Sequence, residues 1–523
     1  MSVLPAYASV ASAQEVTSSG TGVGSITWGE CTNPTLVRFE AECGMLSVPL
    51  DHSRPSGAKI QLAVSRVVHT SSEEDYQGIM LVNPGGPGGS GLIYSVLGAF
   101  VPGDAGSTYD WIGFDPRGVG DSVPALSCDP NYTAGPRPPY DPATVRIEFA
   151  WLVKSAKYAI DCARNGGFLL GHLKTTDTVA DMDAIRQSLG AEKMNFYGFS
   201  YGTYLGQVYA TLHPDLVRRM VLDSNVDPRT VWYQANLDQD PAFEITINKF
   251  FDWVALHDSA YHLGTTGADV QTKYYAALNS LAANPQGQLG ASEWADAFLG
   301  AGYVQFLWPD TADAFAAFVN DADPGPATDL YLGQDTPGDD NGYAMYLATE
   351  CSDAHWPRNW LTWHFDNTRV ARTAPFLTWG NAWFNAPCAF WFAASGQPVN
   401  VDGSRAPAIL LLDETLDAAT PFPGSLEVRQ RFPAASLIAT VGGVNHANSL
   451  FGGVACVDDA VAMYLTDGTL PPRVAGNSAD AECQPAPDPE PNAAAAVSAQ
   501  ATAQAQTTTI STDQLRQLHP MPR

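Results

Sequence analysis

The sequence GFSYG at residues 198–202 restricts the fold of this chain more than any other feature. It lies between an apolar run at 194–197, which has the composition of a buried strand, and a helical pattern at 201–213. A serine flanked by glycines at such a junction is typical of a nucleophile elbow, because the sharp turn strains the serine backbone and leaves no room for a Cβ on either side. The start of the helix offers N–H groups to a developing oxyanion. The motif therefore predicts a nucleophilic Ser200.

Other short apolar runs also end at loop-forming residues, as the run before Ser200 does. These runs are Ile79–Val82, Trp111–Phe114, Met220–Leu222, Ala408–Leu412 and Ser436–Val441. Their composition indicates buried strands of a parallel sheet, with functional groups at the carboxyl ends. Helical spacing lies between some of them, for example over Thr176–Leu189. The alternation predicts an α/β protein with a doubly wound, mostly parallel sheet.

The regular alternation stops between residues 229 and 400, where the chain is rich in Trp, Tyr, Phe and Ala and has helical patterns. We expect a mainly helical cap there, inserted between two parts of an α/β core at 28–228 and 401–483. Residues 1–27 form a separate N-terminal segment. Residues 484–523 are rich in Pro, Ala, Gln and Thr without apolar periodicity, which predicts a mobile tail that carries no catalytic residue.

The charge balance excludes several classes of partner. The chain has 27 Lys and Arg against 55 Asp and Glu, a net charge of −28, and no local basic patch. Nucleic acids and anionic lipid surfaces would repel it. No apolar run reaches the roughly 18 residues that a membrane-spanning helix needs. No Cys or His pair has the spacing of a zinc site, so we predict neither a metal nor a cofactor.

The cysteines indicate an oxidising compartment, since an even number without metal spacing favours disulfides. We predict sequential pairing, because each bond would then close a local loop; buried free thiols are the alternative. The predicted pairs are Cys31–Cys43, Cys128–Cys162, Cys351–Cys388 and Cys456–Cys483.

Two features agree with a secreted protein. Ala11-Ser12-Ala13 has the small-x-small pattern of a signal-peptidase site, so the chain would begin with the remnant of a signal. Asn131-Tyr132-Thr133 is a sequon for N-glycosylation. We therefore expect an extracellular glycoprotein.

A nucleophilic serine needs a base and an orienting carboxylate, which in this kind of fold follow later strands in the order acid, then histidine. Asp417 lies a few residues beyond the run Ala408–Leu412, and His446 follows the run Ser436–Val441. Asp413, directly at its strand end, is the competing acid. The sequence thus predicts the triad Ser200, Asp417 and His446.

A second oxyanion donor, besides the Tyr201 N–H, is expected in the glycine-rich segment NPGGPGGS at 83–90, which follows a predicted strand. A phosphate-binding loop is the rival interpretation. It is excluded because the segment lacks GK[ST] and its prolines have no N–H to donate.

Taken together, GGPGG, DPRGVGDS, GFSYGTYLG, LDAATP, GGVNH and the closing segment from Cys456 to Cys483 resemble the secreted tripeptidyl aminopeptidases of the α/β-hydrolase superfamily, close to the proline iminopeptidases. The resemblance runs from about residue 28 to 483. It implies an α/β-hydrolase fold with a large helical cap. It also implies that Ser200 is the nucleophile, Asp417 the acid, His446 the base, and Gly86 and Tyr201 the oxyanion donors.

The same resemblance implies that Asp115, Arg117 and Ser122 are structural and brace the elbow. The chain departs from the family pattern at two positions. Pro84 stands where proline iminopeptidases have His, although Pro is familiar in the tripeptidyl branch, and Glu414 stands where relatives usually have Gly.

An aminopeptidase must hold the α-ammonium group of its substrate with a carboxylate. Glu350 and Asp353 are the predicted substrate-binding acids, with Asp240 and Glu244 as alternatives, and solvated surface acids as the simpler interpretation of all four. Nearby aromatic residues would form either an apolar pocket or the core of the cap: Trp356, Trp360, Trp363, Trp379, Trp383, Trp391 and Phe392.

The leading function is a secreted serine exopeptidase that cleaves short peptides from free N-termini through an acyl-enzyme. A carboxylesterase with the same triad and small ester substrates is the alternative, and a non-catalytic binding protein is the third hypothesis. The sequence indicates no oligomeric state.

Overall fold

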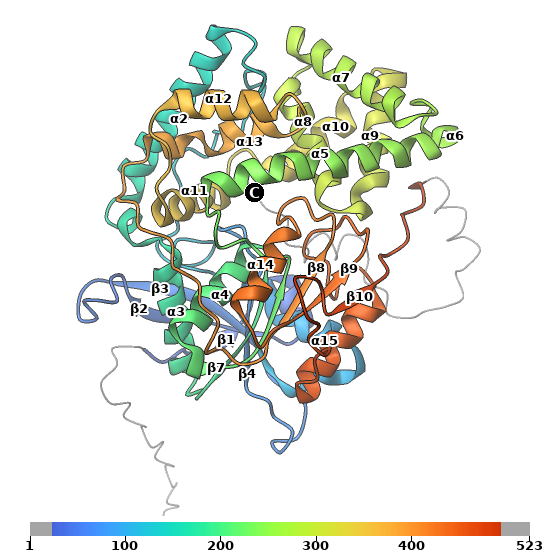
Figure 1. Ribbon diagram of the computed structural model, residues 1–523. Coiled ribbons are helices and arrows are strands. Elements are labelled where there is room, and N and C mark those ends of the chain that lie inside the picture. Colours follow the sequence, from blue (N-terminus) through green and yellow to red (C-terminus); the bar gives the residue numbers. More distant parts are fainter. Residues whose placement is uncertain (1–23, 493–523) are drawn as a thin grey trace, which may run out of the picture.

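The chain folds around a sheet whose strands come from both ends of the sequence. The structure is a computed structural model that describes residues 24–492, and this part contains one ten-stranded sheet in the order β1-β2-β3-β5-β4-β6-β7-β8-β9-β10 (Figure 1). The strands β1 to β3 and β5 pair antiparallel, and the remaining pairs are parallel. The strands are β1 (Gly29–Glu30), β2 (Glu42–Pro49), β3 (Lys59–Val67), β4 (Ile79–Asn83), β5 (Asp110–Phe114), β6 (Met194–Phe199), β7 (Val217–Asp223), β8 (Leu410–Glu414), β9 (Ser436–Thr440) and β10 (Ala481–Cys483).

Each apolar run that was expected to be a strand is one, and the predicted mostly parallel sheet is confirmed. The largest shift is at β7, which begins three residues before Met220. Charged side chains interrupt the apolar run there, but Arg218 bonds Asn195 on the neighbouring strand and Arg219 bonds Tyr109. Tertiary partners therefore extend the strand beyond what the local pattern indicates.

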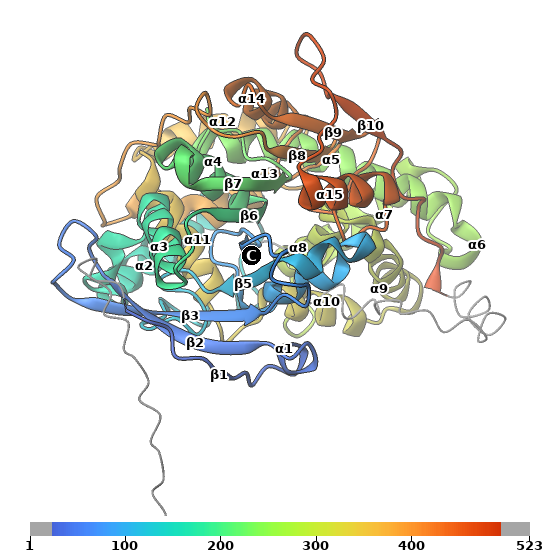
Figure 2. The ribbon, with the colours of Figure 1, turned by 90° about the horizontal axis from the view of Figure 1, so that it is seen from below.

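Both faces of the sheet are covered, which is why its parallel strands are apolar throughout. Along β4, Leu81 belongs to the core cluster under helices α3 and α4, whereas Met80 and Val82 belong to the cluster under α15. Figure 2 shows these helices on opposite sides of the strands. The helices of this part are α1 (Pro34–Arg38), α3 (Thr175–Ser188), α4 (Tyr201–Leu212), α14 (Pro423–Arg431) and α15 (Ala455–Asp467).

A helical layer covers one end of the sheet, next to the carboxyl ends of the parallel strands (Figure 1). Most of it lies between β7 and β8, but α2, which precedes β6 in the chain, packs with it through Trp151 and Trp383. Stacked aromatic rings, including Trp356, Trp360 and Trp363, fill its core. The helices are α2 (Val145–Gly166), α5 (Tyr233–Leu256), α6 (Asp258–Tyr261), α7 (Gly267–Ala283), α8 (Ala291–Tyr303), α9 (Trp308–Asp321), α10 (Gly325–Asp335), α11 (Asn341–Asp353), α12 (Trp360–Val370) and α13 (Thr378–Asn385).

The described part of the chain contains four disulfides and no free cysteine. They join Cys31 with Cys43, Cys128 with Cys162, Cys351 with Cys388, and Cys456 with Cys483, which is the predicted sequential pairing. Disulfides of this kind are typical of proteins from oxidising compartments. Among residues 24–492, no helix has the length and apolar character needed to cross a bilayer.

The first nine residues of the expected tail, 484–492, lie within the described part of the chain and are bonded to the helical layer. The Trp253 indole donates to the carbonyl of Pro489, Gln305 donates to that of Pro487, and Asn492 donates to Asp310 and Asp313. These bonds to backbone carbonyls and to surface carboxylates of the helical layer need no apolar periodicity, so the sequence pattern does not reveal them. The expected signal site at residues 11–13 and the rest of the tail lie outside the described residues.

The Cys351–Cys388 bond gives a prediction about stability. Replacing both cysteines by serine should lower the free energy of unfolding by about 2–4 kcal/mol, because a long closed loop is released in the unfolded chain. These cysteines are 37 residues apart, whereas Cys31 and Cys43 are 12 apart, so the matched double variant of the shorter loop should lose less. Denaturant titration of both variants measures this, and a larger loss for the shorter loop would contradict it.

Candidate active site

Ser200 occupies the turn between β6 and α4 with φ 55° and ψ −126°, a conformation that non-glycine residues rarely adopt. Bonds on both sides keep it there. Its N–H donates to the carbonyl of Asp223 at 3.0 Å, and its carbonyl accepts from the Thr203 N–H at 2.8 Å and the Thr203 hydroxyl at 2.6 Å. The side chain is 7% exposed. The turn thus holds Ser200 at the start of α4, as the GFSYG pattern predicts.

Three glycines make this turn possible. A Cβ on Gly198 would lie 2.5 Å from the carbonyl oxygen of Gly202, and one on Gly202 would lie 2.4 Å from that of Asn83. Gly85, with φ +103°, contacts the turn itself: a Cβ there would lie 2.9 Å from both Ser200 Cβ and the Tyr201 nitrogen. The glycine-rich loop after β4 therefore packs directly against the serine turn.

His446 and Asp417 form a buried pair. His446 Nδ1 lies 2.8 Å from Asp417 Oδ2 and 3.0 Å from Oδ1, and neither side chain is exposed. A carboxylate only accepts, so Nδ1 carries the hydrogen and Nε2 has a free lone pair. Within the described residues His446 Nε2 has no hydrogen-bond partner. It is therefore ready to accept a proton.

The surroundings of Asp417 keep it ionised. Burial alone would raise its pKa, but the charge and hydrogen bond of His446, together with the Thr420 N–H, outweigh burial and hold the pKa below its usual value. The N–H groups of Ala419 and Thr420 donate to Oδ1 at 2.8 and 3.0 Å. The turn after β8 thus supplies a fixed anion to the histidine.

The competing acid, Asp413, is bonded elsewhere. Ser425 on α14 donates to its Oδ2 at 2.5 Å. Burial and the negative charge of Asp417 raise its pKa well above the usual value. Its surroundings therefore favour the neutral form of Asp413, and its side-chain bond leads to α14 rather than to His446.

Glu414, at the position where relatives usually have Gly, holds the loop that carries His446. It accepts the Asn445 N–H at 2.7 Å and the Asn448 amide at 2.8 Å, and a Cβ on Gly443 would lie 2.2 Å from its Oε2. Burial raises its pKa to about 7. Glu414, which departs from the family pattern, thus has the structural role of holding this loop.

Further buried acids hold the same loop, and sequence reasoning missed them. The Ser449 N–H donates to Asp223 at 2.9 Å, and the Leu450 N–H donates to Asp458 at 2.7 Å. Asp223 directly ends β7, so its place at a strand end was the available signal. Asp458 lies on α15 and carried no such signal.

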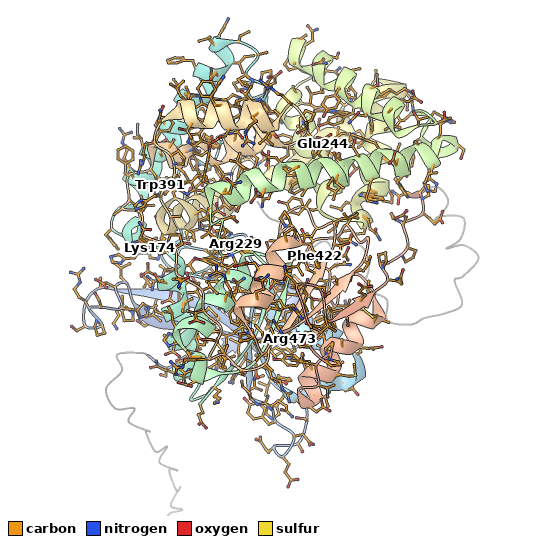
Figure 3. All side chains as sticks on the ribbon, viewed as in Figure 1. Lys174, Arg229, Glu244, Trp391, Phe422 and Arg473 are labelled. Carbon is orange, nitrogen blue, oxygen red and sulfur yellow. A yellow bond between two sulfur atoms is a disulfide. The ribbon has the colours of Figure 1, made fainter. Side chains whose placement is uncertain are left out.

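Ser200, Tyr201 and Gly86 line a cavity of about 1230 Å³ between the sheet and the helical layer. Its wall is acidic, since it includes eight carboxylates and two arginines: Asp227, Asp238, Asp296, Asp310, Asp313, Asp329, Asp335, Glu350, Arg137 and Arg229. Arg229, labelled in Figure 3, lies where the two parts of the fold meet. Within residues 24–492, no three His, Cys, Asp or Glu side chains are grouped so as to hold a metal ion.

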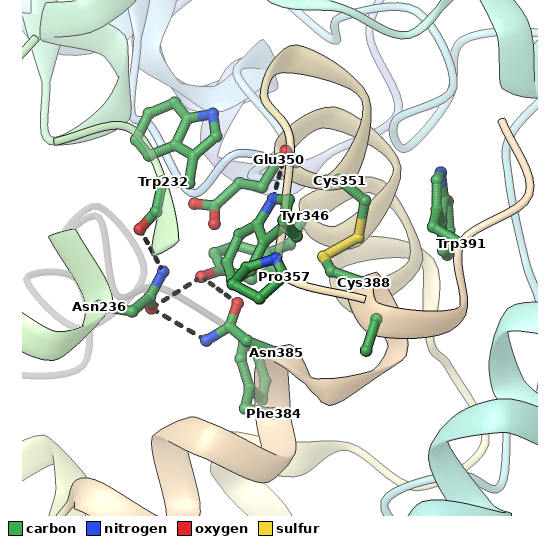
Figure 4. Close-up of a disulfide and its surroundings, with 12 residues drawn as sticks. Trp232, Asn236, Tyr346, Glu350, Cys351, Pro357, Phe384, Asn385, Cys388 and Trp391 are labelled. Atoms are coloured by element: carbon green, nitrogen blue, oxygen red, sulfur yellow. Dashed lines mark hydrogen bonds between the residues drawn. A yellow bond between two sulfur atoms is a disulfide. The ribbon is translucent and has the colours of Figure 1, made fainter. Parts of the chain in front are cut away.

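Of the predicted substrate-binding acids, Glu350 lines this cavity. Figure 4 shows it on α11 beside Tyr346 and the Cys351–Cys388 bond. Its side chain is buried, and Oε2 has no hydrogen-bond partner among the described residues. Burial raises its pKa well above the usual value, although Tyr346 and Asn236 counteract part of this. An unpaired buried carboxyl is costly, so the site favours a cationic partner.

The other predicted acids do not line the cavity. Asp353 accepts three bonds, from the Thr175 N–H, the Thr175 hydroxyl and the Trp232 indole. Asp240 accepts from Asn381 on α13, and Asn381 is the member of this pair that lines the cavity. Glu244 lies within the helical layer and accepts the Phe376 N–H (Figure 3).

Asp115, Arg117 and Ser122 are bonded in networks away from the cavity. Asp115 accepts from Ser90, Arg117 pairs with Asp181 through two bonds of 2.7 Å, and Ser122 joins the Asp115 carbonyl to β3. They fasten the loop after β5 to β3 and α3.

Comparison with known proteins agrees with this arrangement. The family model described as alpha/beta hydrolase fold matches residues 78–357, and that described as TAP-like protein matches residues 374–483. The tripeptidyl aminopeptidase of Streptomyces lividans is 41% identical over 476 residues, which cover 88% of this chain and 87% of the relative.

Two mycobacterial proteins are also similar. The serine protease Hip1 of Mycobacterium tuberculosis is 32% identical over 86% of this chain and 90% of its own length. Carboxylesterase B of the same organism is 34% identical over 83% of this chain and 85% of its own length. The predicted family and fold class are thus confirmed: this chain is an enzyme of the α/β-hydrolase fold and belongs to the family of the tripeptidyl aminopeptidases.

Proposed function

We propose that this chain is a serine aminopeptidase whose nucleophile is Ser200. The unshared electron pair on His446 Nε2 takes the proton of the Ser200 hydroxyl as its oxygen attacks the scissile carbonyl, and Asp417 stabilises the imidazolium that results. His446 then gives the proton to the leaving amine. Water, activated by the same histidine, releases the acyl group from Ser200.

The oxyanion formed in both steps needs donors that are already in place. Tyr201 is the first residue of α4, so its N–H has no partner within the helix. The Gly85 N–H is bound by Asn83 at 3.0 Å, which leaves the next N–H, that of Gly86, as the second donor. Gly86 and Tyr201 both line the cavity beside Ser200.

Glu350 is the residue that favours an aminopeptidase over other serine hydrolases. It is a buried carboxyl with an unpaired oxygen, and it lines the same cavity as Ser200. A substrate ammonium group would ionise it and supply the missing hydrogen bond, which an acetylated N-terminus cannot do. The helical layer at 229–400, which provides this residue, would act as the cap that selects substrates.

The names of the relatives support short peptides as substrates and the release of tripeptides. The relative named carboxylesterase B favours one second candidate, the cleavage of small esters by the same triad. We also propose that the protein is secreted, since its disulfides need an oxidising compartment.

The ammonium site predicts a difference between free and blocked peptides. Wild-type enzyme should cleave a tripeptide anilide with a free amine and turn over its N-acetyl form poorly. Glu350→Gln should raise KM for the free peptide about tenfold to a hundredfold, because a charged hydrogen bond is worth about 1.5–3 kcal/mol. Asp240→Asn is the matched control and should leave KM unchanged. Equal turnover of both anilides would favour the esterase.

The raised pKa of Glu350 predicts how KM depends on pH. Below that pKa the carboxyl is neutral and binds an ammonium weakly, so KM for the free peptide should fall as pH rises through it. The fall ends where the substrate amine loses its proton, at about pH 8. In Glu350→Gln this dependence should vanish, and KM for a neutral ester should be flat in both enzymes. A pH series of initial rates measures this.

Asp413 in β8 and Asp417 in the turn after it give a direct test of the triad. Asp417→Asn should lower kcat/KM about 10³- to 10⁴-fold, because the histidine loses its fixed anion. Asp413→Asn should change it by less than about threefold, since the Asp413 side chain bonds Ser425 on α14 and not His446. Rates with a neutral ester are the measurement. A large loss in Asp413→Asn alone would reverse the assignment of the acid.

A further inference from the structure

We propose that Asp353, acting through Thr175 and Tyr201, is a positioning residue for the oxyanion donor. This inference rests on the proposed function, in which the Tyr201 N–H stabilises the oxyanion. It gives Asp353 a different role from the binding of a substrate amine. The three side chains form one hydrogen-bonded chain that connects α11, α3 and α4.

The direction of this chain follows from the contacts. Thr175 Oγ1 donates to Asp353 Oδ2 at 2.6 Å, and the Thr175 hydroxyl has a single hydrogen. Thr175 Oγ1 lies 2.7 Å from the Tyr201 hydroxyl, so the Tyr201 hydroxyl must be the donor in that bond. The hydrogens therefore run one way, from Tyr201 through Thr175 to the carboxylate.

Asp353 can end such a chain because it only accepts. Its Oδ1 takes the Thr175 N–H at 2.8 Å, and its Oδ2 also takes the Trp232 indole at 3.3 Å. An amide in its place would direct an N–H₂ group at other donors, or would lose the acceptor for the Thr175 N–H. The residue is 6% exposed, so a lost bond is not replaced by bulk water.

The chain fixes a particular backbone atom. Tyr201 follows Ser200 directly, and its side chain is 4% exposed, with its ring against Trp232. With the ring packed and the hydroxyl tethered to the first residue of α3, Tyr201 has little freedom to rotate at the start of α4. Its N–H is held in the direction in which an oxyanion at Ser200 would form.

The same helix also carries Glu350. Asp353 follows Glu350 by three residues on α11, and the Cys351–Cys388 bond fixes the turn between them. One helix therefore sets the position of the ammonium site and, through Thr175, that of the oxyanion donor. The site that binds the substrate amine and the donor used in acylation are therefore both positioned by α11.

The experiment measures the ratio of two constants in wild type, Thr175→Val and Tyr201→Phe: the Kd for an alkylboronic acid and KM for a neutral ester. The boronate adduct on serine resembles the tetrahedral intermediate, whereas the ester in its ground state does not. Loss of a well-placed donor costs about 10²–10³ in rate, so a loosened one should raise the ratio about tenfold or more and lower kcat similarly.

Control variants separate a misplaced oxyanion donor from a general loss of structure. Thr178→Val removes a hydroxyl elsewhere on α3 and should leave the ratio unchanged. The double variant Thr175→Val/Tyr201→Phe should be no worse than either single variant, because both break one chain. Asp353→Asn should raise the ratio while the preference for free over acetylated peptides persists.

An unchanged ratio in Thr175→Val and Tyr201→Phe would overturn the inference, as would loss of the free-amine preference in Asp353→Asn. Other results would show that the proposed function itself is wrong. In that case Ser200→Ala would retain activity, or the wild-type enzyme would not distinguish free from acetylated peptides.

Discussion

The strained turn at Ser200 is the constraint on which the rest of the site depends. A residue with φ 55° at the junction of β6 and α4 projects its side chain out of the turn, but only if nothing crowds the backbone around it. Gly198, Gly202 and Gly85 provide that space. Because Gly85 packs against Tyr201, the same turn fixes where the glycine-rich loop after β4 lies. The proposed nucleophile and its proposed oxyanion donors thus take their positions from one close backbone contact.

Buried acids hold the loop that carries His446 in place. Glu414, Asp223 and Asp458 each accept a backbone N–H of the loop that carries His446. Burial raises the pKa of Glu414 to about 7 and that of Asp458 to about 6. Asp417 differs from these three acids, because His446 and two N–H groups hold its pKa below the usual value. The acids behind the net charge of −28 therefore include buried supports with raised pKa values, the anion beside His446 and the acidic cavity wall.

The sequence revealed those parts of the structure that depend on local order. Ser200 and His446 could be proposed because each lies in the turn or loop after an apolar strand, and the disulfides could be predicted because each closes a local loop. Local order favoured Asp417 but left Asp413, which lies within β8, as a competitor, because the bonds that distinguish the two acids come from Thr420 and Ser425. Glu350 and Asp353 are likewise indistinguishable in sequence. The structure separates them, because Glu350 lines the cavity whereas Asp353 is bonded to Thr175, 178 residues away.

The most direct test of this account is to trap the acyl-enzyme. A tripeptide active ester with a free amine is mixed with the enzyme, the reaction is quenched in acid, and the modified peptide is mapped by mass spectrometry. We expect one adduct, with the mass of the tripeptide acyl group, on the peptide that contains Ser200, and none in Ser200→Ala. An adduct on another residue, or turnover that persists in Ser200→Ala, would contradict it.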